Sequence, residues 1–187
     1  MKLTPLSIPD VLLLEPKQYG DERGFFSEVY NARVFAEADL SYNWVQINHS
    51  MSRGKSTLRG LHFQTPPNAQ AKLIRVTRGA LFDVAVDLRV GSPTFGEWVS
   101  VTLSAKAWNQ VLIPTGFAHG YLTLEPETEV VYKVDDYYAP EADSGVIWND
   151  PDLAIDWPLD DIGPVLSAKD RGLPRLAKID SPFAYGV

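Results

Sequence analysis

The sequence predicts an all-β protein built as a sandwich or a barrel. Its 14 proline and 13 glycine residues separate short runs of β-branched and aromatic residues, and such runs are typical of strands. Many short strands at regular spacing favour two packed sheets or a closed barrel. Helical periodicity is weak. We expect strands at residues 11–14, 25–30, 44–51, 71–77, 80–88, 97–103, 109–113, 118–124 and 129–134.

The connections between these strands carry recognisable turn and cap residues. Residues 77–80 read Thr-Arg-Gly-Ala, which predicts a tight hairpin turn. Asn31 is a suitable N-cap for a short helix that ends at Leu40. Residues 167–170 predict another short turn of helix. From Pro140 onward the chain is rich in Pro and Asp, and we expect this tail to wrap around the core.

Length and composition bound the organisation of the chain. With 187 residues, we expect one domain over residues 1–187. The absence of cysteine excludes disulfides, thiolate metal ligands and a cysteine nucleophile. The N-terminus lacks the apolar run of a signal peptide, and no window approaches the ~20 apolar residues of a spanning helix. We therefore expect a cytoplasmic protein that does not interact with membranes.

Charge is distributed unevenly along the chain. The net charge of −7 argues against nucleic acid as a partner. Residues 40–82 nevertheless contain no Asp or Glu. A local positive field inside an acidic protein suits a small anion such as a phosphate ester, although a solvated basic face is the alternative interpretation. The basic residues of this stretch are Arg53, Lys55, Arg59, Lys72, Arg75 and Arg78.

Only three histidines are present, at positions 49, 62 and 119. A histidine on a strand is more often structural than catalytic, but His62 lies within the acid-free basic stretch and titrates near neutral pH. Strict alternation places Arg59 and His62 on opposite faces of residues 58–64. If both reach one site, Gly60 breaks the alternation as a β-bulge.

A first resemblance involves the turn that precedes His119. The pattern Pro114-x-Gly116-x-x-His119 resembles the second motif of the cupin barrels. Metal-binding cupins also carry His-x-His and a downstream Glu in their first motif. Here Gln64 stands two residues after His62, and residues 65–82 contain no Glu. The sequence therefore predicts a cupin-like barrel without a metal site.

A more specific resemblance extends over residues 5–170. The motifs read, in order, RGFFSE at 23–28, QINHS at 46–50, LRGLHFQ at 58–64, KLIRV at 72–76, DVAVDLR at 83–89, IPTGFAHG at 113–120 and YK at 132–133. This ordered set resembles the dTDP-4-dehydrorhamnose 3,5-epimerase family. The resemblance implies a cupin-like jelly-roll barrel with a few short peripheral helices, a homodimer, and no metal or organic cofactor.

The resemblance also implies an activity and the residues that perform it. The family epimerises C3 and C5 of dTDP-4-dehydro-6-deoxy-D-glucose to give dTDP-4-dehydro-L-rhamnose, by removing and returning protons α to the C4 ketone. His62 is then the base, Asp170 its partner, and Tyr132 the acid on the opposite face. Lys72 would stabilise the developing C4 oxyanion. Without the resemblance, Tyr132 would be interpreted as a core aromatic and Asp170 as a surface or helix-end charge.

The resemblance assigns substrate-binding roles to further residues. Arg59 corresponds to the diphosphate clamp, for which a guanidinium fork is well suited. Arg23, Phe26 and Glu28 correspond to nucleotide contacts made partly across the dimer. Tyr138 corresponds to an aromatic that stacks on thymine. Further substrate contacts are expected at Gln46, Asn48, His119, Asp143 and Lys169, although Asp143 stands where some relatives carry Glu, and Ile47 where relatives often carry Asp.

Alternative functions remain open from the sequence. A related epimerase that inverts only C3 or only C5 would also need His62 and Tyr132. A non-catalytic cupin could bind a nucleotide sugar without reaction, although the full set of base, acid and lysine argues against this. A metal-dependent cupin oxygenase or isomerase is disfavoured because the metal ligands are missing.

Overall fold

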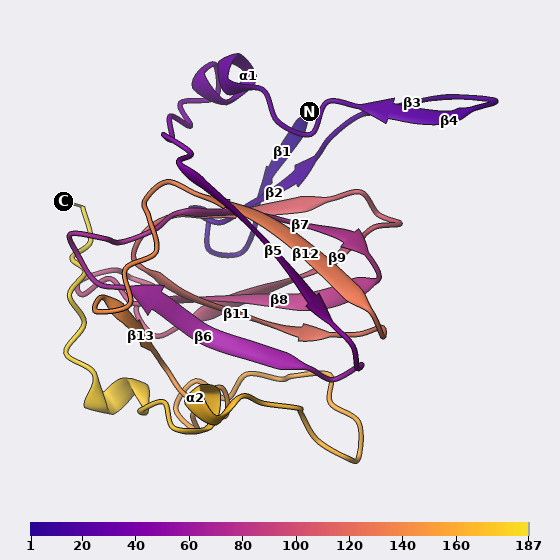
Figure 1. Cartoon of the computed structure of the whole chain (residues 1–187). Coiled ribbons are helices and arrows are strands. Elements are labelled where there is room, and N and C mark those ends of the chain that lie inside the picture. Colours follow the sequence, from indigo (N-terminus) through magenta and orange to yellow (C-terminus); the bar gives the residue numbers. More distant parts are fainter. Residues whose placement is uncertain (187) are drawn as a thin grey trace.

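Two antiparallel sheets packed face to face form the body of the molecule (Figure 1). The computed structural model describes residues 1–186, so residue 187 of the expected domain lies outside the described residues. One sheet has the order β1 (Lys2–Pro5), β2 (Leu12–Glu15), β10 (Gln110–Ile113), β7 (Lys72–Arg78), β12 (Thr128–Val134) and β5 (Gln46–Ser52). The other has the order β13 (Asp143–Gly145), β6 (Leu58–Gln64), β11 (Phe117–Thr123), β8 (Ala80–Asp87) and β9 (Trp98–Ser104). The predicted all-β, cupin-like jelly roll is confirmed.

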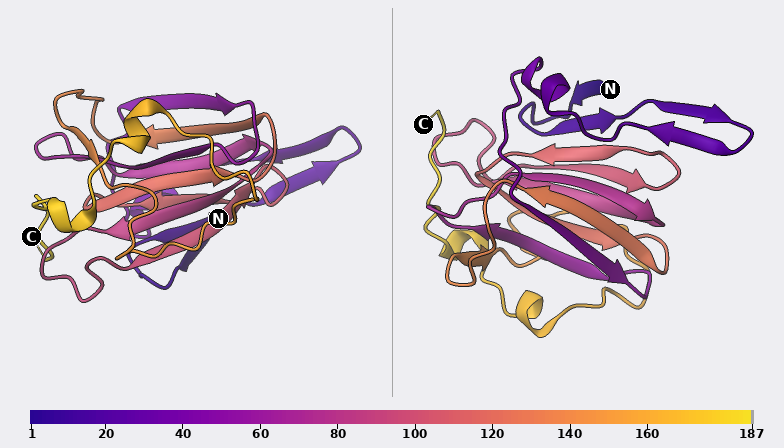
Figure 2. Two further views of the ribbon diagram at one scale, coloured as in Figure 1. Left: turned by 90° about the horizontal axis from the view of Figure 1, so that it is seen from below. Right: turned by 45° about the horizontal axis from the view of Figure 1, so that its top comes forward.

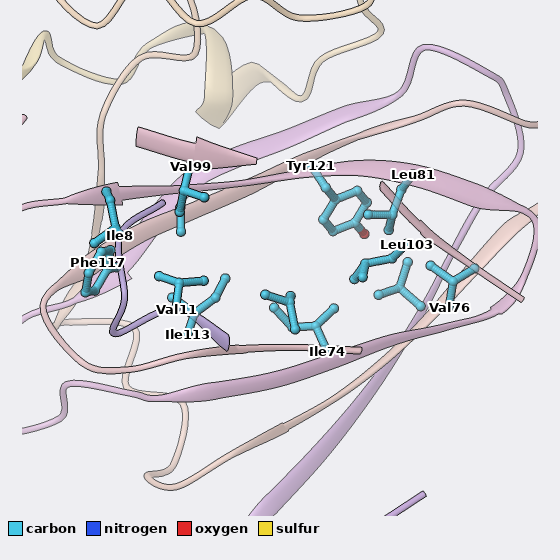
Figure 3. Close-up of a cluster of buried hydrophobic side chains, with 13 residues drawn as sticks. Ile8, Val11, Ile74, Val76, Leu81, Val99, Leu103, Ile113, Phe117 and Tyr121 are labelled. Atoms are coloured by element: carbon cyan, nitrogen blue, oxygen red, sulfur yellow. The ribbon is translucent and has the colours of Figure 1, made fainter. Parts of the chain in front are cut away.

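The space between the two sheets holds the main hydrophobic core. Alternate side chains of each strand point inward, as the period of two requires. Figure 3 shows Ile74 from β7 and Tyr121 from β11 approaching each other from opposite sheets. The core includes Ile8, Val11, Val76, Leu81, Val99, Leu103, Val111, Ile113, Phe117 and Val130.

The tail after β13 covers the outer face of the five-stranded sheet. Val146, Leu153 and Trp157 belong to the same buried hydrophobic cluster as Leu58 and Leu61 of β6. Figure 2 shows the course of the C-terminal segment along this side of the molecule. This segment includes α2 (Ala168–Arg171) and the 3-10 helix η1 (Leu176–Lys178). The prediction that the tail wraps around the core is confirmed, and its course brings α2 against β6.

Near the N-terminus, the predicted helix is present but shorter than expected. α1 (Ala32–Ala36) begins after Asn31, whose side chain caps the Arg33 N–H. It ends early because Asp39 adopts a left-handed conformation with φ of 58°, and the Leu40 N–H returns to the Phe35 carbonyl in a Schellman-type cap. Phe35 is buried against the outer face of the six-stranded sheet.

The predicted strand 25–30 is the largest departure from the expected elements. Only Gly24–Ser27 forms a strand, β4, which pairs with β3 (Gln18–Asp21), a strand that was not predicted. β3 and β4 form a separate two-stranded hairpin that extends away from both sheets (Figure 1). β1 was also not predicted, because its four residues end in a proline and lie at the edge of the sheet. The hairpin predicted at 77–80 is present between β7 and β8, with φ of +76° at Gly79.

No helix within residues 1–186 has the length and apolar character needed to cross a membrane.

Candidate active site

A cavity of about 400 Å³ opens between the two sheets. Strands β5, β7 and β12 contribute side chains from one sheet, and β6 and β11 contribute side chains from the other. Segments after β12 and around α2 complete the rim. The lining residues are Gln46, Asn48, Ser50, Arg59, His62, Phe63, Gln64, Gln70, Lys72, His119, Tyr121, Tyr132, Tyr138, Asp143, Ser167, Lys169 and Asp170.

On the five-stranded sheet, His62 is paired with a buried carboxylate. Its Nε2 lies 2.6 Å from Oδ1 of Asp170, which is 3% exposed. Ser167 caps α2 by accepting the Asp170 N–H at 3.0 Å, and its hydroxyl donates to Asp170 Oδ2 at 2.7 Å. Burial lowers the pKa of His62, and the charge of Asp170 partly opposes this shift. The imidazole is therefore neutral at pH 7 and held in one orientation.

Gly60 allows Arg59 and His62 to reach the same cavity. Pairing between β6 and β11 joins His62 to His119 and Arg59 to Tyr121, so β6 has one residue more than its partner at this point. Gly60 has a φ of +127°, and a Cβ there would lie 2.4 Å from Gly120 Cα. The predicted β-bulge at Gly60 is confirmed, and only glycine fits this close approach.

The six-stranded sheet supplies the opposite wall. Tyr132 of β12 pairs in register with Asn48 of β5, while Val134 pairs with both Lys72 and Gln46. This register brings Tyr132, Asn48, Lys72 and Gln46 to the inner face of the sheet. Burial raises the pKa of the Tyr132 phenol above 10, so the phenol keeps its proton at neutral pH.

Lys72 contributes an ammonium group to the lining of the cavity. Burial lowers its pKa to about 8, even though the carboxylates of Asp143, Asp83 and Asp135 act in the opposite direction. At neutral pH the group is still mostly charged. The cavity therefore contains a neutral imidazole on one wall, and a protonated phenol and an ammonium on the other.

One carboxylate organises the rim of the cavity. The Tyr138 hydroxyl donates to Asp143 Oδ2 at 3.0 Å, and the Lys169 ammonium pairs with the same oxygen. The Tyr138 N–H also donates to Gln46 Oε1 at 3.1 Å, which ties the rim to β5. An exposed aromatic ring and a cation thus lie together beside the opening.

The sequence model described as dTDP-4-dehydrorhamnose 3,5-epimerase matches residues 5–178. The chain belongs to the dTDP-4-dehydrorhamnose 3,5-epimerase family. The resemblance noted in the sequence is thereby confirmed, and it covers both walls of the cavity and α2.

Individual relatives of this family agree with the assignment. The chain is 55% identical over 181 residues to the dTDP-4-dehydrorhamnose 3,5-epimerase of Pseudomonas aeruginosa, covering 96% of this chain and 98% of the relative. It superimposes with a TM-score of 0.94 and 44% identity on the crystal structure of dTDP-6-deoxy-D-glucose-3,5-epimerase from Legionella pneumophila in complex with dTDP-4-keto-L-rhamnose, covering 100% and 99% of the two chains. A 3'-monoepimerase from Streptomyces bikiniensis, in complex with dTDP-quinovose, gives a TM-score of 0.85 and 38% identity, covering 92% and 87%.

Of the residues that the family resemblance singled out, three lie away from this cavity. Arg23, Phe26 and Glu28 are on or just after the β3–β4 hairpin and do not line it. Arg23 pairs with Asp21, Glu28 accepts a hydrogen bond from Asn31, and Phe26 is 70% exposed. The other predicted catalytic and binding residues all line the cavity.

Several lining residues were not predicted. Ser50 and Gln64 lie within motifs that carry the family resemblance but were given no role, and Gln70 and Ser167 carry no signal of their own. Tyr121 shares the inward face of β11 with His119, and alternation could have placed it in the site. The Tyr121 hydroxyl lies 3.1 Å from the Ser50 hydroxyl on the opposite sheet.

Asp83 was also not identified as a site residue, although it lies directly behind His119. It lies in the middle of a strand whose only other charged residue is the terminal Asp87, and a carboxylate at that place is a signal that could have been recognised in the sequence. Over the described part of the chain, no three His, Asp or Glu side chains are grouped so that they could hold a metal ion.

Proposed function

We propose that the protein is an epimerase that inverts C3 and C5 of dTDP-4-dehydro-6-deoxy-D-glucose to give dTDP-4-dehydro-L-rhamnose. Inversion at a carbon requires proton removal on one face and proton delivery on the other. The observation that carries the proposal is that His62 and Tyr132 face one cavity from opposite sheets. Family membership over residues 5–178 supports the same substrate class.

His62 acts as the base in this proposal. A carboxylate only accepts hydrogen bonds, so the contact with Asp170 assigns the ring proton to Nε2 and leaves the lone pair on Nδ1. Nδ1 removes a proton from the carbon next to the C4 ketone, and the electrons move onto the C4 oxygen to give an enolate. Asp170 then stabilises the imidazolium that forms.

Tyr132 and Lys72 complete the reaction from the other wall. The phenol of Tyr132 delivers a proton to the opposite face of the same carbon, which inverts its configuration. The Lys72 ammonium stabilises the oxyanion at C4 while the enolate exists. Each of these groups is protonated at neutral pH, as its role requires.

The remaining groups of the cavity suit the dTDP portion of the substrate. Arg59 offers a guanidinium fork for the diphosphate, and Lys169 adds a second cation at the rim. The exposed Tyr138 ring is available for stacking on thymine. Gln46 and Asn48 present amide groups on the inner face of β5 for the sugar.

Solvent exchange tests the proposed reaction directly. The purified protein is incubated with dTDP-4-dehydro-6-deoxy-D-glucose in D₂O, and the recovered sugar is examined by NMR. We expect deuterium at both C3 and C5 and the L-configured product. Exchange at one carbon alone would indicate a mono-epimerase, an activity to which the Streptomyces bikiniensis relative gives structural precedent. Absence of exchange would indicate a binding protein.

We further propose that the β3–β4 hairpin completes the nucleotide site of a second copy in a homodimer. Arg23, Phe26 and Glu28 correspond to nucleotide-binding positions of the family but lie outside the cavity of their own chain. The hairpin also exposes Tyr19, Phe25 and Phe26. Exposed aromatics on a projecting arm are typical of a surface that contacts another protein.

Mixing two inactive variants tests whether the β3–β4 hairpin of one subunit completes the site of the other. His62→Asn disables the cavity but keeps the hairpin intact, whereas Phe26→Ala impairs the hairpin but keeps the cavity intact. After mixing and subunit exchange, we expect about a quarter of wild-type activity, because half of the dimers carry one complete site. If light scattering shows the mixture to be dimeric and no activity is recovered, the hairpin does not complete the partner's site. If the protein is a monomer at the assay concentration, the proposed homodimer is wrong.

A further inference from the structure

Asp83 is a carboxylate buried inside the barrel. It lies on β8 and is 1% exposed, and its neighbours on the same face, Leu81 and Ala85, belong to the hydrophobic core. Moving a carboxylate from water into such surroundings is strongly unfavourable unless a partner compensates. Here the partner is His119, whose Nε2 lies 2.9 Å from Asp83 Oδ2.

His119 lies next to His62 on the wall of the cavity. The two residues are directly paired across β11 and β6. Each histidine has its own carboxylate, but from a different direction: Asp170 belongs to α2 outside the sheet, and Asp83 belongs to the neighbouring strand β8. Within residues 1–186, the one hydrogen bond of the His119 ring is the bond from Nε2 to Asp83, and His119 is a lining residue of the cavity.

We propose that Asp83 is a positioning residue for the epimerisation, which fixes the His119 imidazole beside His62 so that Nδ1 contacts the substrate sugar. The inference rests on the proposed epimerase function. Because the carboxylate accepts the Nε2 proton, the ring cannot rotate or change its tautomer without leaving a buried charge unpaired. Asp83 thus acts on the substrate through His119 and does not itself line the cavity.

A second consequence concerns Lys72 on the opposite sheet. Burial lowers the pKa of Lys72, and the negative charge of Asp83 is one of the three carboxylate charges that counteract this shift. Burial in turn raises the pKa of Asp83, and His119 and Lys72 oppose that change. The negative charge of Asp83 therefore acts on His119 in one wall of the cavity and on Lys72 in the other.

A double-mutant cycle over Asp83→Asn and His119→Gln tests the proposal, with kcat and KM measured for each variant. We expect each single variant to lose on the order of 10²-fold in kcat with KM changed by less than about threefold, because a displaced group near the reacting atoms is enough for such a loss. The double variant should be no slower than His119→Gln within about twofold, since Asp83 acts through that ring.

Asp87→Asn is the matched control. Asp87 is a fully buried carboxylate on the same face of β8, but it bonds to Arg89 and Ser92 away from the cavity. We expect it to lower the unfolding temperature while the folded fraction retains wild-type kcat. If Asp83→Asn does not fold, Asp83→Glu enters the same cycle with the same expected outcome, because its longer side chain cannot keep the 2.9 Å contact.

Two outcomes would overturn the inference. One is an unchanged kcat in the Asp83 variant, and the other is an equal loss from the Asp83 substitution in the presence and absence of the His119 side chain. Both are measured relative to an active wild-type enzyme. An inactive wild-type protein would instead contradict the proposed function.

Discussion

The three histidines show how surroundings determine the chemistry of a residue. His49 is exposed on β5 and faces Glu129, outside the cavity. His62 and His119 lie inside the cavity wall, and each contacts a buried carboxylate. Of these two, His62 has its carboxylate held in turn by the hydroxyl and cap of Ser167. The most rigidly supported imidazole is therefore the one assigned to proton abstraction.

Substitution of His62 tests that assignment. His62→Asn removes the base but keeps a polar side chain of smaller size, and we expect kcat to fall on the order of 10³-fold or more and solvent exchange to stop. His49→Asn is the matched control and should retain wild-type rates. Residual exchange near the wild-type rate in His62→Asn would show that another group removes the proton.

The pH dependence of kcat/KM should have two limbs. On the acidic side, burial lowers the pKa of His62 below its usual 6.5, so the base stays neutral at pH 7 and activity declines only below pH 6.5. On the alkaline side, the pKa of Lys72 is about 8, so its ammonium is lost and activity falls as pH rises through about 8. The Tyr132 pKa lies above 10 and does not explain a decline there. Constant kcat/KM up to pH 9.5 would contradict the role of Lys72.

Ser167 gives a further residue-level prediction. Its hydroxyl contacts both the N–H and the carboxylate of Asp170, so Ser167→Ala frees the carboxylate that orients His62. We expect kcat to fall about tenfold with little change in KM, and stability to fall by about 1 kcal/mol from the lost helix cap. Steady-state kinetics and denaturant unfolding measure the two effects, and an unchanged kcat would contradict the orienting role.

At the scale of single elements, the sequence predicted strands better than their ends. Most strands of the two sheets had a predicted counterpart. β1 and β13 had none, and β6 was inferred only from the alternation of side chains along residues 58–64. The end of α1 was predicted too late, because the Schellman-type cap depends on the conformation of Asp39 rather than on a glycine. The strand predicted at 25–30 ends early because β4 pairs only within its own hairpin.

The bulge in β6 has a measurable role in stability. Gly60→Ala introduces a Cβ against Gly120 Cα at a φ of +127°, and we expect the free energy of unfolding to fall by about 3 kcal/mol. Gly24→Ala is the control, because Gly24 has nearly the same φ of +128° but no atom within 4 Å of the added Cβ. We expect a loss of about 1 kcal/mol there. Equal losses in urea unfolding would show that contact with β11 is unimportant.

At the scale of the whole molecule, the site is assembled from distant segments. His62 and Asp170 are 108 residues apart, and their contact depends on the tail returning across the five-stranded sheet. Residue spacing cannot predict such a contact, and only the family resemblance pointed to it. The same holds for Tyr132, which alone would be interpreted as a core aromatic. The bulge at Gly60, by contrast, was predicted from alternation, on the condition that Arg59 and His62 reach one site.

The two-sheet architecture also explains why base and acid are separated. Each sheet contributes one wall, with His62 on one and Tyr132 and Lys72 on the other, so the proposed reaction has the sugar between them. A rigid scaffold of this kind holds proton donor and acceptor apart while the planar enolate lies between them. Inversion, rather than simple exchange, follows from this separation.

Tyr132→Phe separates exchange from inversion and tests this arrangement most directly. In D₂O, with solvent deuterium and product configuration followed together by NMR, the variant keeps its base but lacks the proton donor of the opposite wall. We predict that deuterium still enters the sugar through His62, while formation of the inverted product falls by 10²-fold or more. Loss of exchange and inversion to the same extent would contradict the assignment of base and acid to opposite walls.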